Sequence, residues 1–248
     1  MRILAVLLAA NLAIGDAKAD VFSGAYAGVI GSLNFAGTTG NVSQYSGPSF
    51  SLLVVGYYPS SLNADLNDFS IGGIFGYGRT IGRLYFGLEA DVSASFGNSN
   101  FQVSHPITII TTPPVAAGVY SDYTLVSKFE SDWYATARGR MGVIVSDSFM
   151  LYATVGLAAV DVDAEITLSA KATSRFGHVT ANTIRFGPVL GVGTDFSINQ
   201  KMNLRAEYQY AWIGNLDVTT IGPHVDDLIT YRYNLDRHLL RIGITSNF

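Results

Sequence analysis

The stretch that decides the fold is residues 84–96, LYFGLEADVSASF, in which apolar and polar residues alternate. Side chains of a β-strand point to opposite faces in turn, so one face of this segment is apolar from Leu84 to Phe96. The other face carries Glu89 and Asp91. In a water-soluble protein the apolar face would be buried. The two acids can point inward only if the apolar face meets lipid.

The first 19 residues, MRILAVLLAANLAIGDAKA, have the features of a secretory signal peptide. Arg2 precedes an apolar run from Ile3 to Ile14, and Ala17-Lys18-Ala19 matches the small-residue cleavage rule. The run is well short of the ~20 residues that a membrane-spanning helix needs. We therefore expect residues 1–19 to be removed, which leaves residues 20–248 as one domain.

The composition favours a protein surface in contact with lipid. Charged residues make up 14% of the chain, against about 25% in typical soluble domains. Tyr and Phe number 14 each beside 26 Gly, and Cys is absent, so no disulfide can hold the fold. The net charge of -4 argues against a nucleic-acid partner, because nucleic acid requires a basic face.

The pattern of Leu84–Phe96 recurs along the chain. Beyond residue 20 no apolar run reaches half the length of a transmembrane helix, so any membrane crossing must use strands. Each predicted strand meets or exceeds the ~9 to 11 residues that a tilted membrane strand needs. The eight predicted strands are residues 21–33, 69–78, 84–96, 131–145, 149–162, 183–197, 202–212 and 237–248.

Connection lengths alternate between short and long. Three connections have only three to five residues: RTIGR, SDS and INQK. Bacterial outer-membrane barrels have this asymmetry, with short periplasmic turns and long extracellular loops. The sequence therefore predicts an all-β, eight-stranded antiparallel up-and-down transmembrane β-barrel. Its long loops, expected to be irregular, are Asn34 to Asp68, Gly97 to Glu130, Asp163 to Asn182 and Ile213 to Asp236.

Charges of both signs fall on the face opposite the large apolar residues, and we expect them inside the barrel. Distances from the adjoining short turns match Glu89 with Arg140, and Asp91 with Arg138. A soluble lipocalin-like barrel is the alternative, but it would leave the apolar face exposed to water. The predicted interior charge cluster contains Glu89, Asp91, Arg138, Arg140, Arg205 and Glu207, with Arg185, Asp195 and Arg241 as possible extensions.

Aromatic residues lie at the ends of the predicted strands. Transmembrane barrels carry a girdle of aromatic side chains at each membrane interface. We expect the loop-side girdle to contain Phe35, Phe96, Trp133 and Trp212, and the turn-side girdle to contain Phe196 and Phe248.

Several segments together carry a family resemblance: SGAYAGVIGS, LYFGLEADVSAS, ARGRMGVIV, FGPVLGVGTDF, NLRAEYQYAWIG and LLRIGITSNF. The chain resembles the small porin-like outer-membrane barrel family of alphaproteobacteria, which includes major surface antigens. The resemblance implies outer-membrane lipid, lipopolysaccharide, periplasmic chaperones and the insertion machinery as partners. It also implies that Phe248 is part of the assembly signal, although Ser246 replaces the aromatic residue often found two positions earlier.

The expected function is structural. An eight-stranded barrel is just wide enough to be filled by its own side chains, so we expect a closed lumen and loops that contact host or envelope components. No cofactor is expected. The sequence contains neither a G-x-S-x-G nor an H-E-x-x-H motif, so no motif of this kind indicates an enzyme. A small-solute pore and an outer-membrane enzyme are weaker alternatives. A haem- or ligand-binding receptor is another, using the loop histidines His105, His178 and His224, with His238 nearby.

Overall fold

The structure is a computed structural model that describes residues 21–46, 55–56, 62–96, 105–110, 121–170, 176–221 and 227–248. The predicted signal peptide lies outside these residues. No helix in the described part of the chain is long and apolar enough to cross a membrane.

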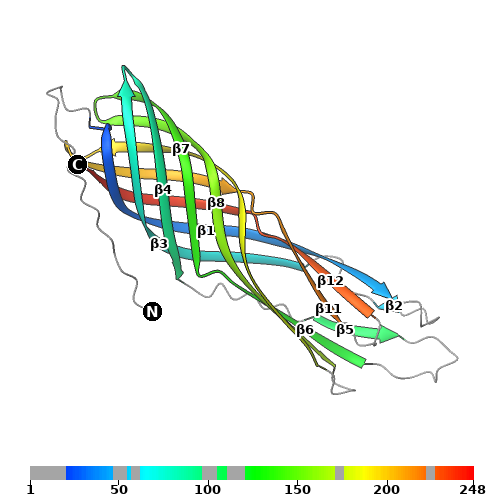
Figure 1. Cartoon of the computed structure of the whole chain (residues 1–248). Helices are drawn as coiled ribbons and strands as arrows, with labels where there is room; N and C mark the ends of the chain where they lie inside the picture. The colour runs from blue at the N-terminus through cyan, green and yellow to red at the C-terminus, as the bar shows by residue number, and fades with distance from the viewer. Residues whose placement is uncertain are drawn as a thin grey trace.

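Eight strands form a closed antiparallel ring (Figure 1). Each pairs with the next around the ring, and the last strand pairs back with the first. The predicted eight-stranded barrel is therefore confirmed. In ring order the strands are β1 (Gly24–Ser46), β3 (Leu62–Ile81), β4 (Leu84–Phe96), β7 (Trp133–Ser146), β8 (Phe149–Ala170), β9 (Phe176–Ser197), β10 (Met202–Ala211) and β13 (Arg237–Asn247).

The short connections lie at one end of the barrel. β3 and β4 are joined by two residues, of which Gly82 has a φ of 63°. Only glycine adopts this left-handed region without strain, which explains its place in so tight a turn. The other two turns occupy residues 147–148 and 198–201. Asn199 closes the second by accepting hydrogen bonds from the backbone N–H groups of Lys201 and Met202, both at 2.9 Å.

For the loop residues that the structure describes, the prediction of irregular structure at the opposite end is wrong. β1 and β3 remain paired as far as Gly40 and Leu62, and β8 and β9 as far as Ser169 and Phe176. The sheet visibly continues beyond the barrel in Figure 1. Five further strands extend it: β2 (Val55–Gly56), β5 (His105–Ile110), β6 (Ser121–Glu130), β11 (Asn215–Ile221) and β12 (Asp227–Asn234).

These extensions have a simple physical cause. Membrane thickness sets only the minimum length of a strand, because backbone groups gain hydrogen bonds from further pairing in water as well. β6 pairs with the end of β8, and β12 pairs with the end of β1. The predicted strands therefore ended too early wherever the sequence stopped alternating between apolar and polar residues.

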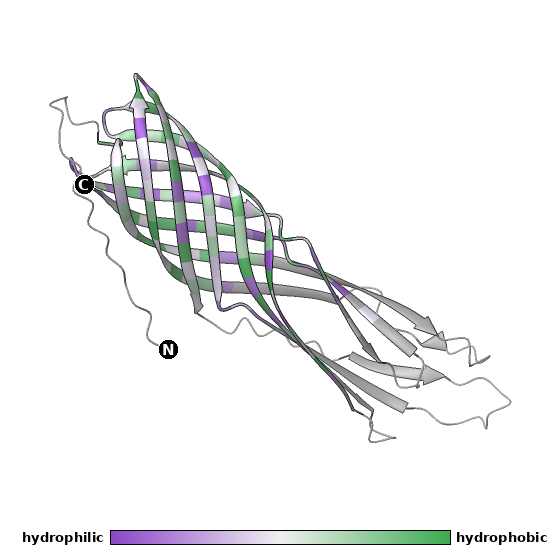
Figure 2. Ribbon diagram, viewed as in Figure 1, coloured by the Kyte–Doolittle hydropathy of each residue, from purple (hydrophilic) through white to green (hydrophobic). Residues whose placement is uncertain are grey.

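Side chains alternate between the two faces of the barrel wall as predicted. On β4, Leu88 is 72% exposed on the outside, whereas the adjacent Glu89 is only 5% exposed. On β8, Leu157 is 63% exposed beside the buried Ala158. Figure 2 shows the resulting alternation of hydrophobic and hydrophilic residues along the strands. An apolar exterior around a charged interior requires lipid outside, which answers the question that Glu89 and Asp91 raise.

Inward glycines make room for inward tyrosines. A Cβ atom added to Gly78 would lie 2.1 Å from the hydroxyl oxygen of Tyr85, and one added to Gly76 would lie 2.4 Å from that of Tyr26. Tyr85 packs with Phe22, Met150 and Tyr152 in a small buried cluster near the turn end. These two glycines weaken the alternation of the sequence in β3, because the tyrosine side chains occupy the space that larger inward residues of β3 would fill.

Candidate functional site

Eight charged side chains meet inside the barrel. Four are acids and four are arginines, so their formal charges cancel. None is more than 6% exposed. This lumen charge cluster consists of Glu89 and Asp91 on β4, Arg138 and Arg140 on β7, Asp195 on β9, Arg205 and Glu207 on β10, and Arg241 on β13.

Arg138 is a centre of the cluster. Its Nη2 atom lies 2.5 Å from Glu89 Oε1 and 2.9 Å from Asp91 Oδ2, and its Nη1 atom lies 2.6 Å from Glu207 Oε1. The first two contacts follow from the sheet, because Arg138 is the register partner of Glu89 on the neighbouring strand. The third crosses the lumen to β10. A single guanidinium thus joins two parts of the wall that do not pair with each other.

Arg205 makes a second set of contacts from β10. It donates from Nε to Asp195 Oδ1 at 2.8 Å, and from Nη1 to Glu89 Oε2 on the far side of the lumen. Arg140 donates to the other oxygen of Asp195 at 2.9 Å. Asp195 therefore accepts hydrogen bonds from Arg205 on the adjacent β10 and from Arg140 on β7, two strands away, and these pairs offset the cost of its burial.

Arg241 completes the set from β13. Its Nη2 atom donates to Asp91 Oδ1 at 2.6 Å, and the second oxygen of Asp91 accepts a hydrogen bond from Thr136. Every acid of the cluster therefore contacts at least one arginine. Buried charges that are paired and hydrogen-bonded in this way avoid the large cost of an isolated charge.

Tyrosines form the turn-side border of the cluster. Tyr26 donates to Glu89 at 2.6 Å, and Tyr152 donates to Glu207 at 2.9 Å. The guanidinium carbon of Arg140 lies 3.9 Å from the ring centroid of Tyr152, a cation–π contact. The sequence reasoning missed these tyrosines. A glycine opposite an inward tyrosine could have indicated them: the register partner of Tyr26 is the inward Gly76, and that of Tyr152 is the inward Gly193.

The structure brings all six residues of the predicted cluster together, but with a different register. The register partner of Glu89 is Arg138, not Arg140, and that of Asp91 is Thr136. The predicted ion pairs are nevertheless present, with Arg140 3.4 Å from Glu89 and Arg138 2.9 Å from Asp91. The prediction assumed that neighbouring short turns lie at equal height. In a closed barrel the strands are tilted and staggered, which shifts the pairing of β4 with β7 by two residues. Of the possible extensions, Asp195 and Arg241 belong to the cluster, whereas within the described residues Arg185 makes no ion pair with it.

The predicted girdle residues lie on the outside of the wall. Trp133 is half-buried and the other five side chains are exposed. Trp212 packs edge-to-face against Tyr210, with ring centroids 4.5 Å apart. His238 joins this group through a 2.7 Å contact with the hydroxyl of Tyr208. The exposed five are Phe35, Phe96, Trp212, Phe196 and Phe248.

The structure does not bring the predicted histidine ligands to one place among the residues that it describes. His105 begins β5 and His178 lies exposed on β9, with two strands, β6 and β8, between them. His224 lies outside the described residues. The one group in the described ranges whose ligand atoms could share a metal ion contains no histidine and consists of Asp132, Asp161 and Asp163.

A closed ring of eight strands, apolar outside and charged inside, defines a transmembrane β-barrel of the outer-membrane class. Comparison with known families agrees. The chain belongs to the outer membrane protein β-barrel domain family, whose model matches residues 3–226. It is an outer-membrane protein.

The relatives extend this assignment. The chain is 26% identical over 117 residues to the 31 kDa outer-membrane immunogenic protein of Brucella melitensis, a match that covers 47% of the chain and 46% of that protein. It is also 26% identical to the 22 kDa outer membrane protein of Rhizobium leguminosarum bv. viciae, over 77% of the chain and 73% of that protein. The chain thus spans about half the length of the Brucella relative.

Among solved structures, the fold is similar to that of the outer membrane protein OprG from Pseudomonas aeruginosa. The TM-score is 0.50 at 12% sequence identity, covering 91% of this chain and 96% of OprG. At this level of identity the similarity concerns the fold alone.

Proposed function

We propose that this chain is a structural, surface-exposed protein of the outer membrane with a closed lumen, whose hairpins contact host or envelope components. The observation that supports the closed lumen best is the contact of Arg205 with Glu89, which joins opposite sides of the barrel. Eight strands enclose a space that side chains can fill. Here they fill it with ion pairs, so a solute would have to break several of them to pass.

The same contacts give the cluster a second proposed role, in fixing the register of the barrel. A shift of one residue between two strands would turn every inward side chain outward and place arginines in lipid. Arg138 and Glu89 are register partners, and Arg205 and Asp195 are also partners on adjacent strands. Each pair fixes the register of its own two strands, β4 with β7 and β9 with β10. The cluster therefore acts in assembly and stability, not in catalysis.

The surface role rests on the strands that continue past the barrel. The strands β11 and β12 form a hairpin with seven register pairs, and Arg232 and Asp217 make a bidentate ion pair on its exposed face, with N–O distances of 2.8 and 2.9 Å. Such a hairpin offers an ordered polar surface beyond the membrane. Lipopolysaccharide and a host surface ligand are the partners that we propose for it.

Cysteine labelling tests the surface role directly, because the chain has no cysteine of its own. Thr219→Cys places a thiol on β11, and Gln200→Cys places one in the turn between β9 and β10; both positions are exposed. A membrane-impermeant maleimide added to intact cells should label the first variant only. Both should react after lysis. Labelling of Gln200→Cys alone on intact cells would contradict the proposed orientation.

Conductance tests the closed lumen. The protein reconstituted in a planar bilayer should show no steady open state, and vesicles containing it should not swell in sugar solutions. The double variant Glu89→Ala/Arg205→Ala removes the contact across the lumen and should raise ion flux. Stable, sugar-permeable channels from the unchanged protein would contradict the proposal.

A further inference from the structure

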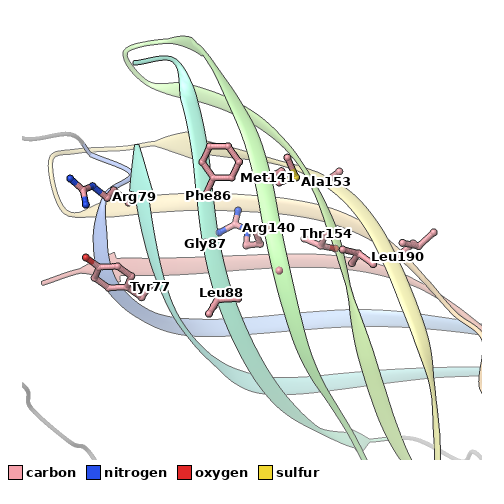
Figure 3. A pocket seen from close by; sticks show the side chains of 12 residues that line it. Tyr77, Arg79, Phe86, Gly87, Leu88, Arg140, Met141, Ala153, Thr154 and Leu190 are labelled. Carbon is pink, nitrogen blue, oxygen red and sulfur yellow. The ribbon is translucent and has the colours of Figure 1, made fainter. Parts of the chain in front are cut away.

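The outer wall of the barrel contains a hollow of about 560 Å³, at a place where lipid would otherwise meet a continuous apolar surface. It lies over β4, β7 and β8, toward the end with the short turns, and Figure 3 shows it from close by. This volume is within the ~300–1,000 Å³ typical of small-molecule sites. Most of its lining residues are apolar, and Arg79 is the exposed polar side chain at one end; Arg140 and Thr154 also line it, but their side chains are buried in the barrel.

The hollow results from one glycine in a row of large side chains. Register partners on five neighbouring strands form a row of outward residues: Tyr77, Leu88, Gly139, Val155 and Leu190. Leu88 and Val155 are 72% and 60% exposed on either side of Gly139, which has no side chain to fill the gap between them. In the next row Ala153 is short beside Met141, which widens the gap.

Arg79 supplies the polar end of the hollow. It lies on the outward face of β3, is exposed, and is the register partner of Phe86, another lining residue. Only two residues separate it from Gly82 in the tight turn, which puts it near the end of the barrel, where lipid headgroups would lie. Arginines near membrane surfaces attract anionic lipid groups, and their charge is poorly tolerated deeper in the bilayer.

We propose that this hollow binds one phospholipid of the periplasmic leaflet, with an acyl chain over Gly139 and the phosphate at Arg79. The short turns mark the periplasmic end of an outer-membrane barrel, and glycerophospholipids form that leaflet. The apolar floor is open to the lipid-facing surface, and the exposed guanidinium of Arg79 complements a phosphate, whereas that of Arg140 is buried and already paired with Asp195. An apolar small molecule, or an apolar side chain of a second copy, would leave Arg79 without a counter-charge.

Native mass spectrometry of the purified barrel tests this proposal. The probes are dioleoylphosphatidylglycerol and dioleoylglycerol, which share acyl chains and differ in the phosphate. The barrel should retain one phosphatidylglycerol and far less of the uncharged lipid. Arg79→Gln should weaken retention about fivefold, the change expected for one arginine near a membrane surface. Arg83→Gln is the matched control, an exposed turn arginine that does not line the hollow, and should change nothing.

Filling the hollow provides the second test. Gly139→Leu should abolish retention, since an added Cβ meets only an ordinary contact 3.8 Å away and the longer side chain then occupies the space. Gly73→Leu is the control: Gly73 is an exposed glycine of β3 where an added Cβ meets nothing within 4 Å. Heat-modifiable gel migration shows whether each variant has folded.

Three results would overturn the proposal. Equal losses from Gly139→Leu and Gly73→Leu would indicate a non-specific lipid layer. Equal retention of the two probes, unaffected by Arg79→Gln, would indicate an apolar site without phosphate recognition. A dimer lost on Gly139→Leu, with no lipid bound to the unchanged protein, would indicate contact between two copies. If Gly139→Leu does not fold, the Arg79 and Arg83 variants still decide the question.

Discussion

Arg205 on β10 contacts Glu89 on β4, and three strands separate these two on either side of the ring. The pair therefore spans the barrel at its widest. Glu89 also accepts from Arg138 and Tyr26, so loss of its carboxylate leaves several donors without a partner.

Removal of one member of this pair should be costly. We expect Glu89→Ala or Arg205→Ala alone to lower the free energy of unfolding by about 3 to 5 kcal/mol if the cluster is dry, and by less if water reaches it. The double variant should cost less than the sum of the two, because neither charge is then left alone. Urea unfolding in lipid vesicles, followed by tryptophan fluorescence, measures all three. Strict additivity would show that the two side chains do not interact.

The exposed ion pair between Asp217 and Arg232 is the natural comparison. Its side chains are 46% and 57% exposed, so water already solvates both charges. Asp217→Asn should leave the urea midpoint unchanged, because exposed pairs contribute little to stability. A shift as large as that of Glu89→Ala would mean that burial is not what makes the lumen charge cluster important.

Substitutions at Leu157 test whether the outer wall of the barrel meets lipid. Leu157→Arg should destabilise the barrel by up to about 2 to 4 kcal/mol if the position lies near the membrane midplane, since a charge there must leave water. Leu157→Ser, which removes apolar surface without adding a charge, should cost clearly less. The same unfolding assay in vesicles compares them. If Leu157→Arg were no more destabilising than Leu157→Ser, this face would not meet lipid.

A substitution at Gly78 tests whether Tyr85 packs against this glycine. Gly78→Ala should cost about 1 to 3 kcal/mol, because the new methyl group would overlap Tyr85, which is 1% exposed and has no room to move. Gly73→Ala, on the outer face of the same strand, should be close to neutral, since nothing lies within 4 Å of the added atom. Heat-modifiable gel migration at graded temperatures ranks the two. Equal effects would point to backbone conformation instead.

Phe248 tests assembly. It is 64% exposed on the outside, and its N–H donates to Ala25 O at 3.0 Å, next to the start of β1. Deletion of Phe248 should lower the fraction of chains that reach the outer membrane as folded barrels. Fractionation of cells at matched expression measures this fraction, with Phe248→Tyr as the control that keeps an aromatic residue. Unchanged assembly of the truncated chain at high expression would argue against a role for this residue as a signal.

The inside and the outside of the barrel could be predicted from the sequence because side-chain alternation is a local property. Leu88 and Glu89 are adjacent in the sequence, so their side chains point to opposite faces of the strand, one toward lipid and the other into the lumen. Register could not be obtained in this way. The pairing of Glu89 with Arg138 depends on the stagger of the whole ring, which cannot be deduced from the sequence of any single strand.

The extent of the strands was also beyond the sequence reasoning. Beyond the membrane both faces of a strand meet water, so residues such as Thr180 and Asn182 on β9 have no apolar face to reveal a strand. Their pairing with Glu165 and Asp163 rests on backbone hydrogen bonds, which any residue except proline can make. The contacts of Tyr26 with Glu89 and of Tyr152 with Glu207 were not predicted, because they join strands that are not neighbours and no local pattern reveals them.

The continuous pairing of β8 with β9, from the turn side to Ser169 and Phe176, constrains how the part of this protein beyond the barrel can vary. Insertion of one residue within the paired segment would exchange the two faces of everything beyond it, whereas insertion of two would restore them. Natural variants of this chain should therefore differ by substitution along the hairpins, or by length changes at their tips. Odd-numbered insertions inside the paired strands should be rare.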